Sequence, residues 1–224
     1  MVNIDTVYQK VLAFANKEQR GYITPKEFNL FAEQAQMEIF EQYFYDLNQH
    51  ARAPGNSREY SDIIHNINEK IAIFENTATI NSGVISAPDL YRLGTVIASG
   101  TTEVEEVQQN EILYINKSPL TKPTISRPVY VRTGPSSITT YPTNSLSTTC
   151  TYTKTPTKPN WGYIVLDGTA MYDTMAAVNF ELHKSEESEL VYKILKYAGV
   201  TLKNPEVVQI GSALEQSQVQ QEKQ

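Results

Sequence analysis

The sequence contains few of the residues on which metal and thiol chemistry depends. Among its 224 residues there are one cysteine, Cys150, and three histidines. A single cysteine cannot form an internal disulfide bond, and no CxxC pair or Cys/His group has the spacing of a zinc site. We therefore expect a protein that folds under reducing conditions and that binds neither a metal ion nor another cofactor.

Long apolar runs are also missing. No stretch approaches the roughly 18 consecutive apolar residues of a membrane-spanning helix. The segment 1–5 has neither the basic nor the apolar region of an export signal. These features predict a soluble protein that is made in the cytoplasm, is not exported and has no membrane partner.

Catalytic motifs are absent as well. The chain has no GxGxxG, GxxxxGK[ST], HExxH or GxSxG sequence. His50, His65 and His183 lie far apart and are expected at the surface or at its boundary, whereas Cys150 lies in a threonine-rich strand pattern and is expected to be buried. We predict a protein that is not an enzyme and has no catalytic residues.

One region has no acidic residues. Between residues 112 and 166 the chain has six basic side chains and no Asp or Glu, although its net charge is −6. The six are Lys117, Lys122, Arg127, Arg132, Lys154 and Lys158. Regions of opposite charge suit a subunit that docks onto copies of itself or onto acidic partners.

Apolar residues at helical spacing predict three helices in residues 1–76. Asn3 or Asp5 is a candidate N-cap for the first helix, and Gly21 is placed to end it. Thr24-Pro25-Lys26-Glu27 has the pattern of a capping box with proline at the first helical position, which predicts the start of the second helix. The third helix is expected between Tyr60 and Phe74.

The middle region, 77–168, is expected to form a small β module. Residues 78–86 and 90–99 are rich in Ile, Val and Thr, and 128–132, 138–141 and 148–154 also have strand character. The segment 103–115 is ambiguous, and we favour a short helix there. Residues 121–159 hold 12 Thr and 6 Pro, so a disordered linker is the alternative to this module.

The C-terminal part, 169–214, is predicted to be helical. Trp161–Leu166 is expected to be a short strand that ends at Asp167-Gly168. Ser185 is the candidate N-cap of a helix with Leu190, Val191, Ile194, Leu195 and Ala198 on its apolar face, and Asn204-Pro205 starts a last helix. Residues 215–224 form a polar, Gln-rich tail.

The predicted fold class is α+β: N-terminal and C-terminal helices form a helical bundle with an inserted small antiparallel β module.

Two strings carry a family resemblance: GYITPKEFNLFAEQAQMEIFEQYFYDLNQ and FELHKSEESELVYKILKYAGVTLKNPEVVQ. With SPLTKPT and RPVYV between them, the chain resembles tailed-bacteriophage virion structural proteins of crAss-like and related marine phages. The resemblance implies a head-to-tail connector or ring subunit, a neck adaptor between portal and tail, in a ring of twelve copies. It implies no catalytic residues.

The expected function is that of a structural virion protein of the neck or tail region. It would assemble into a closed ring with itself and dock the portal protein and other neck or tail proteins, with packaged DNA as a further contact. The candidate interface residues are Arg127, Arg132, Tyr141, Lys154, Val207, Ile210 and Leu214. The alternatives are a minor capsid or tail structural protein, or a DNA-contacting module that uses the basic β segment.

Overall fold

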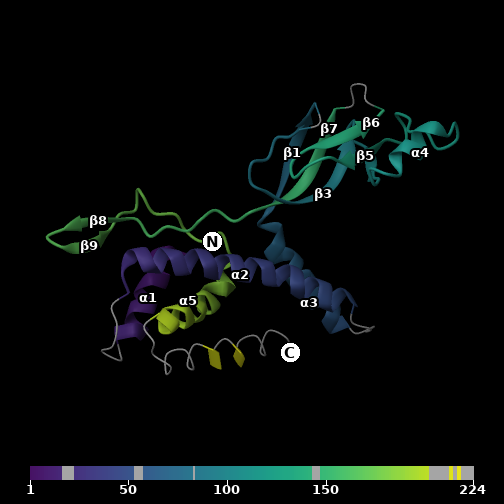
Figure 1. Ribbon diagram of the computed structural model, residues 1–224. Helices are drawn as coiled ribbons and strands as arrows, with labels where there is room; N and C mark the ends of the chain where they lie inside the picture. The colour runs from purple at the N-terminus through teal and green to yellow at the C-terminus, as the bar shows by residue number, and fades with distance from the viewer. Residues whose placement is uncertain are drawn as a thin grey trace. The chain divides into compact units, whose positions relative to one another are not determined.

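The computed structural model (Figure 1) describes residues 1–16, 23–52, 58–82, 84–142 and 147–201, together with 212–213 and 216–217. The chain divides into two compact units. Met1–Ile73 and the chain from Pro156 onward form the helical unit, and Phe74–Thr155 form the sheet unit. The sheet unit is thus an insertion between two halves of the helical unit.

The helical unit is built on α2, which packs against α3 and α5, while α1 packs against α5. Its elements are α1 (Ile4–Asn16), α2 (Pro25–Arg52), α3 (Arg58–Ala72), β8 (Tyr163–Leu166), β9 (Thr169–Tyr172), the 3₁₀ turn η1 (Lys184–Glu186) and α5 (Glu187–Thr201). Phe28, Phe40 and Phe180 are fully buried in its core. The predicted apolar face of α5 is confirmed, because all five of its residues are buried.

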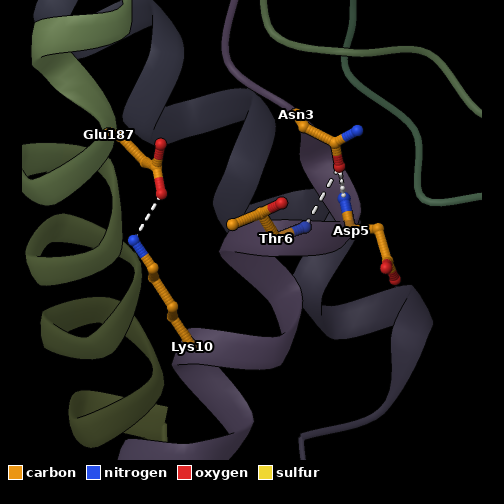
Figure 2. Close-up of polar contacts among 5 residues, drawn as sticks. All are labelled: Asn3, Asp5, Thr6, Lys10 and Glu187. Carbon is orange, nitrogen blue, oxygen red and sulfur yellow. Dashed lines mark hydrogen bonds and ion pairs between the residues drawn. The ribbon is translucent and has the colours of Figure 1, made fainter.

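The start of α1 is fixed by a side-chain cap. Asn3 Oδ1 accepts hydrogen bonds from the backbone N–H groups of Asp5, at 2.9 Å, and Thr6, at 3.1 Å (Figure 2). These are two of the donors that a helix leaves without an internal partner. Figure 2 also shows the ion pair between Lys10 and Glu187, which joins α1 to the first turn of α5.

The capping box of α2 is confirmed. The Glu27 backbone N–H donates to Thr24 Oγ1 at 3.3 Å, and the Thr24 backbone N–H donates to Glu27 Oε2 at 3.0 Å. Hydrogen bonds from Thr24 hold the pKa of the Glu27 carboxyl below its usual value. The predicted Ser185 cap of α5 is wrong: His183 Nδ1 accepts from the Ser185 N–H at 3.3 Å, and the turn η1 leads into α5 at Glu187.

The sheet unit contains a seven-stranded sheet in the order β2-β1-β7-β3-β4-β5-β6. The strands are β1 (Glu75–Asn81), β2 (Val84–Ile85), β3 (Leu90–Ala98), β4 (Thr102–Glu106), β5 (Val129–Arg132), β6 (Ile138–Tyr141) and β7 (Thr148–Lys154). The pair β4–β5 is parallel, and all other pairs are antiparallel. Val84 forms a bridge with Ser137, and the Ile85 N–H donates to Ser136 O at 2.9 Å. These contacts bring the two edges of the sheet together and nearly close it into a barrel.

The predicted fold class is therefore wrong. The protein is a mixed α/β protein in which the nearly closed sheet dominates, and it is not a helical bundle with a small antiparallel module. Each strand that the sequence predicts is recognised from the residues within it. The number of strands that join into one sheet depends instead on which segments of the chain pair with one another. Here β7 lies between β1 and β3 and joins strands that are distant in sequence.

The sheet core follows from the alternation of side chains along each strand. In β7, Thr148, Cys150 and Tyr152 are buried and the residues between them are not, as the two-residue repeat of a strand requires. Cys150 is buried as predicted, and burial raises the pKa of its thiol. A smaller cluster of Ile112, Val129 and Val131 joins β5 to α4 (Ile112–Lys117).

The helix expected over 103–115 is wrong in its first half. Thr102–Glu106 is strand β4, which pairs with β3 on one side and with β5 on the other. Val104 is the only buried residue of this strand, so the strand lacks the regular alternation of buried and exposed residues that would distinguish it from one face of a helix. The two available strand partners decide the outcome, and the helix α4 begins at Ile112.

Candidate functional site: an apolar hairpin arm

The most distinctive surface feature of the helical unit is the two-stranded hairpin of β8 and β9 (Figure 1), which we call the hairpin arm (Tyr163–Tyr172). Its register pairs Tyr163 with Tyr172 and Leu166 with Thr169. The turn residues Asp167 and Gly168 have φ angles of 49° and 79°. Positive φ at both central residues defines a two-residue turn whose twist matches that of the strands, and Asp-Gly is among its preferred sequences.

The arm exposes apolar side chains on both of its faces. Ile164, Val165, Leu166 and Met171 are each between 54% and 60% exposed with respect to the described residues. Successive side chains point to opposite faces of a strand, so neither face of β8 is covered by the described chain. An isolated two-stranded hairpin is marginally stable in water, and clustered apolar exposure is typical of a binding surface.

Trp161 anchors the base of the arm to the helices. Its indole Nε1–H donates to Asp5 Oδ1 at 2.9 Å, and its backbone N–H donates to Asn29 Oδ1 at 2.8 Å. Its ring lies between aromatic neighbours, with ring centroids 4.3 Å from Tyr8 and 5.6 Å from Tyr172. Both α1 and α2 therefore hold Trp161, which lies two residues before the arm.

The loop that follows β9 closes tightly over Gly162. The Asp173 N–H donates to Gly162 O at 2.8 Å, and the Asn160 side-chain amide donates to Ala176 O at 2.9 Å. A Cβ atom on Gly162 would lie 2.7 Å from three backbone atoms of this loop. Only glycine allows this approach, so the base of the arm is held rigidly while its strands remain exposed.

The four predicted interface residues that the structure describes lie in the sheet unit. Arg127 and Arg132 are exposed, and Tyr141 and Lys154 are half-buried. Arg132 is the last residue of β5, and Arg127 lies two residues before the strand begins. Five residues of extended chain place the two arginines about 16 Å apart. Tyr141 pairs with Val129 across β5 and β6, whereas Lys154 is on β7, with β3 and β4 between. The sheet thus gathers three of these residues near one edge and places Lys154 elsewhere.

The other three predicted interface residues, Val207, Ile210 and Leu214, lie outside the described residues, as does the helix expected to start at Asn204-Pro205. Arg132 has a structural partner: its guanidinium donates to Gly134 O at 3.3 Å and to Pro135 O at 3.0 Å. This leaves Arg127 as the more available of the two arginines for a contact.

Next to Arg132, the Tyr130 hydroxyl donates to Glu106 Oε2 at 3.0 Å. Burial and this carboxylate raise the pKa of Tyr130 to about 12, because both disfavour a phenolate. The group therefore remains a neutral donor that ties β5 to β4. Across the described residues, no three His, Cys, Asp or Glu side chains are placed to hold a metal ion.

Sequence reasoning identified β8 and its turn but missed β9 and the exposure of the arm. Apolar residues on both sides of Asp167-Gly168 are the signal for a complete hairpin. Their exposure has no comparable local signal, because an apolar run is also the pattern of a buried strand.

None of the helices in the described part of the chain combines the length and apolar character needed to cross a bilayer. No protein-family model matches the chain, and no curated protein matches it significantly.

Proposed function

We propose that the protein is a structural subunit of a tailed-phage virion, of the head-to-tail connector type. It assembles into a closed ring and docks neighbouring proteins of the neck or tail. The observation that carries the assembly role is the hairpin arm, which is rigid at its base and apolar along its strands. The phage setting rests on the resemblance of the sequence.

Burial of the apolar side chains of the arm would contribute a substantial free energy of association. Complete burial of a Val, Leu, Ile or Met side chain is worth about 1.5–3 kcal/mol. Ile164, Val165, Leu166 and Met171 each keep more than half of their surface exposed, between 54% and 60%. Each has roughly 1 kcal/mol left to gain, so the four together supply roughly 4 kcal/mol for one contact between subunits.

The arm also offers backbone groups. Each of its two strands has only the other as a partner among the described residues, so the outer edges of β8 and β9 are open to a neighbouring strand. The seven-stranded sheet is less suited to such pairing, because its end strand β2 is bridged to the residues that precede β6. We therefore place the principal subunit contact at the arm rather than at the edge of the sheet.

The distribution of charge supports contacts between unlike surfaces. The sheet unit has six acidic and six basic side chains, so the helical unit carries the whole net charge of −6. Within the sheet unit all acidic residues precede residue 112, and five of the six basic residues follow it. A ring of identical subunits uses two different surfaces at each contact, and separated charges help to align them.

The test is the change Val165→Glu, measured by size-exclusion chromatography with light scattering over a concentration series. The wild-type protein is expected to form a closed oligomer. The variant should need at least tenfold more protein to do so, because it places a carboxylate in an apolar contact. The matched control is Leu30→Glu on α2, since Leu30 and Val165 are both 60% exposed.

Equal assembly of the wild-type protein and Val165→Glu would show that the arm is not the contact. A wild-type protein that stays monomeric and co-purifies with neither portal nor tail proteins would contradict the connector role itself. Salt-sensitive binding to duplex DNA that is lost in Arg127→Ala would instead favour the DNA-contacting alternative.

A further inference from the structure

The sheet unit has an exposed apolar surface of its own. It lies on residues 112–127, which begin with α4 and end before β5, and we call it the α4 segment. Four of the five large apolar side chains that are exposed among the described residues of this unit belong to the segment. They are Leu113, Tyr114, Leu120 and Ile125, with exposed fractions between 63% and 95%. Clustered apolar exposure of this kind is typical of an interaction surface.

Backbone hydrogen bonds hold the α4 segment in a defined shape. A bond of 3.0 Å joins the ends of residues 118–122, and two bonds of 3.0 and 3.3 Å join the ends of residues 124–127. Ile112 of α4 is buried against two valines of β5 and anchors the segment to the sheet. Leu120 and Ile125 thus lie within two closed turns, where Gly, Pro, Asn, Asp and Ser are the usual residues. An apolar side chain gains nothing from such a turn, which indicates a contact with another molecule.

The charges of the α4 segment are all positive. Lys117, Lys122 and Arg127 are exposed, and the segment contains no Asp or Glu. In the part of the chain that the structure describes, no carboxylate forms an ion pair with any of the three. The apolar side chains are therefore accompanied by three cations that are available to a partner.

The hairpin arm has the opposite charge. Residues 159–183, which contain the arm and both of its flanks, include Asp167, Asp173 and Glu181 and no Lys or Arg. Asp167 is exposed in the turn of the arm, and its carboxylate has no hydrogen bond or ion pair with a described residue. Each of the two surfaces thus combines exposed apolar side chains with three charges of one sign, and the signs are opposite. Such complementarity aligns two surfaces and selects the correct partner.

We propose that the hairpin arm of one subunit docks onto the α4 segment of a second copy of the same chain. The apolar side chains of the arm contact those of the α4 segment, and Asp167 lies among its cations. Because the two surfaces differ, each subunit uses both of them and contacts two neighbours, as a closed ring requires. This inference rests on the arm as the subunit contact proposed above, and it adds the surface that receives the arm.

An anionic membrane surface is the other partner that this chemistry fits. Lipid-binding basic segments usually carry about four to eight Lys or Arg residues, whereas the α4 segment has three. The arm, in contrast, matches both the apolar side chains and the number of charges. The observations therefore favour a second copy of the chain.

The test combines two variants of the full-length protein. Leu120→Glu damages the α4 segment and leaves the arm intact, whereas Val165→Glu damages the arm and leaves the α4 segment intact. Each variant alone should need at least tenfold more protein to assemble, because each places a carboxylate in an apolar contact. A mixture of the two retains one intact contact, between the arm of Leu120→Glu and the α4 segment of Val165→Glu. The mixture should therefore form a one-to-one complex and nothing larger.

Amide chemical shifts measure this complex even when it is weak. Unlabelled Leu120→Glu is titrated into ¹⁵N-labelled Val165→Glu, and signals from residues 112–127 should shift saturably. Unlabelled Val165→Glu, which has no intact arm, should cause no shift. Shifts with both partners or with neither would overturn the proposal. Raising the ionic strength from about 0.1 M to about 1 M shortens the screening distance from about 10 Å to about 3 Å, so the complex should weaken severalfold, and a complex unchanged by salt would contradict the pairing of charges.

Tyr114→Glu provides a second variant of the α4 segment with a matched control. Tyr114 on α4 and Tyr45 on α2 are both exposed, at 75% and 66%, so neither substitution disturbs a core. Tyr114→Glu should need at least tenfold more protein to assemble, and Tyr45→Glu should assemble as the wild-type protein does. Equal effects of the two would refute the location.

The outcomes separate this inference from the connector proposal. If Val165→Glu weakens assembly and neither Leu120→Glu nor Tyr114→Glu does, the arm remains the contact, but the α4 segment does not receive it and this inference is wrong. If the wild-type protein does not assemble, both proposals are wrong. Binding to vesicles of phosphatidylserine and phosphatidylcholine that Leu120→Glu abolishes, with assembly unchanged, would overturn the inference and assign the α4 segment to a membrane surface.

Discussion

Gly162→Ala tests the rigid base of the hairpin arm. The added methyl group would lie 2.7 Å from Ala176 C, Ala177 N and Asp173 O, all of which are backbone atoms. Favourable contacts between carbon atoms are about 3.5–4.0 Å, so the loop must move by roughly 0.8 Å or more. Backbone cannot turn aside as a flexible side chain can, and the movement must therefore disturb the hydrogen bonds that hold the loop.

Four hydrogen bonds hold this loop. Asp173 N–H donates to Gly162 O at 2.8 Å, the Asn160 amide donates to Ala176 O at 2.9 Å, and Asn160 and Val178 exchange two backbone bonds of 2.8 and 3.0 Å. Loss of two or three of them costs about 2–3 kcal/mol. Alanine also lowers the conformational entropy of the unfolded chain, which offsets about 0.4–1 kcal/mol of this destabilisation. The expected net destabilisation of the helical unit is about 2 kcal/mol.

The single tryptophan makes this change directly measurable, because Trp161 is adjacent to the substitution and is buried in the helical unit. Urea unfolding followed by tryptophan fluorescence should show a midpoint lower by about 1 M, given a usual dependence of about 2 kcal/mol per M. The control Ala176→Ser adds one heavy atom at an exposed position of the same loop and should change stability by less than about 0.5 kcal/mol. A Gly162→Ala protein as stable as that control would refute the close packing of the loop.

Two further predictions concern local interactions in each unit. Thr24→Ala removes the hydroxyl that caps α2 and should destabilise the helical unit by about 1 kcal/mol in the same urea assay, whereas Thr24→Ser should restore most of the loss. The pKa of Tyr130 is raised to about 12 from an ordinary value of 10, so the neutral phenol contributes its full stability to the sheet unit below pH 10. Above pH 10 the unfolded chain ionises before the folded one, and this contribution is lost as the pH rises through 12. Urea unfolding followed by circular dichroism at increasing pH should therefore show roughly 3 kcal/mol more loss of stability for the wild-type protein than for Tyr130→Phe, and equal losses would contradict the burial and bonding of this phenol.

The parts of the fold that could be predicted from the sequence depend on residues close together in the chain. Thr24 and Glu27 are one helical turn apart, and their reciprocal bonds form as expected. The strands at 128–132, 138–141 and 148–154 also correspond closely to β5, β6 and β7. Each of these features has a local cause, either a capping pattern or the alternation of β-branched and aromatic residues.

The errors arose where distant segments decide the outcome. The first part of 103–115 forms a strand because β3 and β5 are available on either side. The error at Ser185 is an exception with a local cause: His183, two residues earlier, accepts the N–H of Ser185, and the 3₁₀ turn moves the start of α5 to Glu187. Among the candidate interface residues, Arg127, Arg132 and Tyr141 come close to one edge through β5–β6 pairing, and Lys154 is separated from them by two strands.

The sequence by itself determined the starts of α1 and α2, the apolar face of α5, the positions of most strands and the separation of basic from acidic segments, because these depend on neighbouring residues and on composition. Tertiary structure alone decided that seven strands form one nearly closed sheet and that the apolar residues of β8 are exposed rather than buried. The physical reason is that burial and strand pairing depend on which distant segments meet, and the free energy of that meeting is not contained in any local pattern.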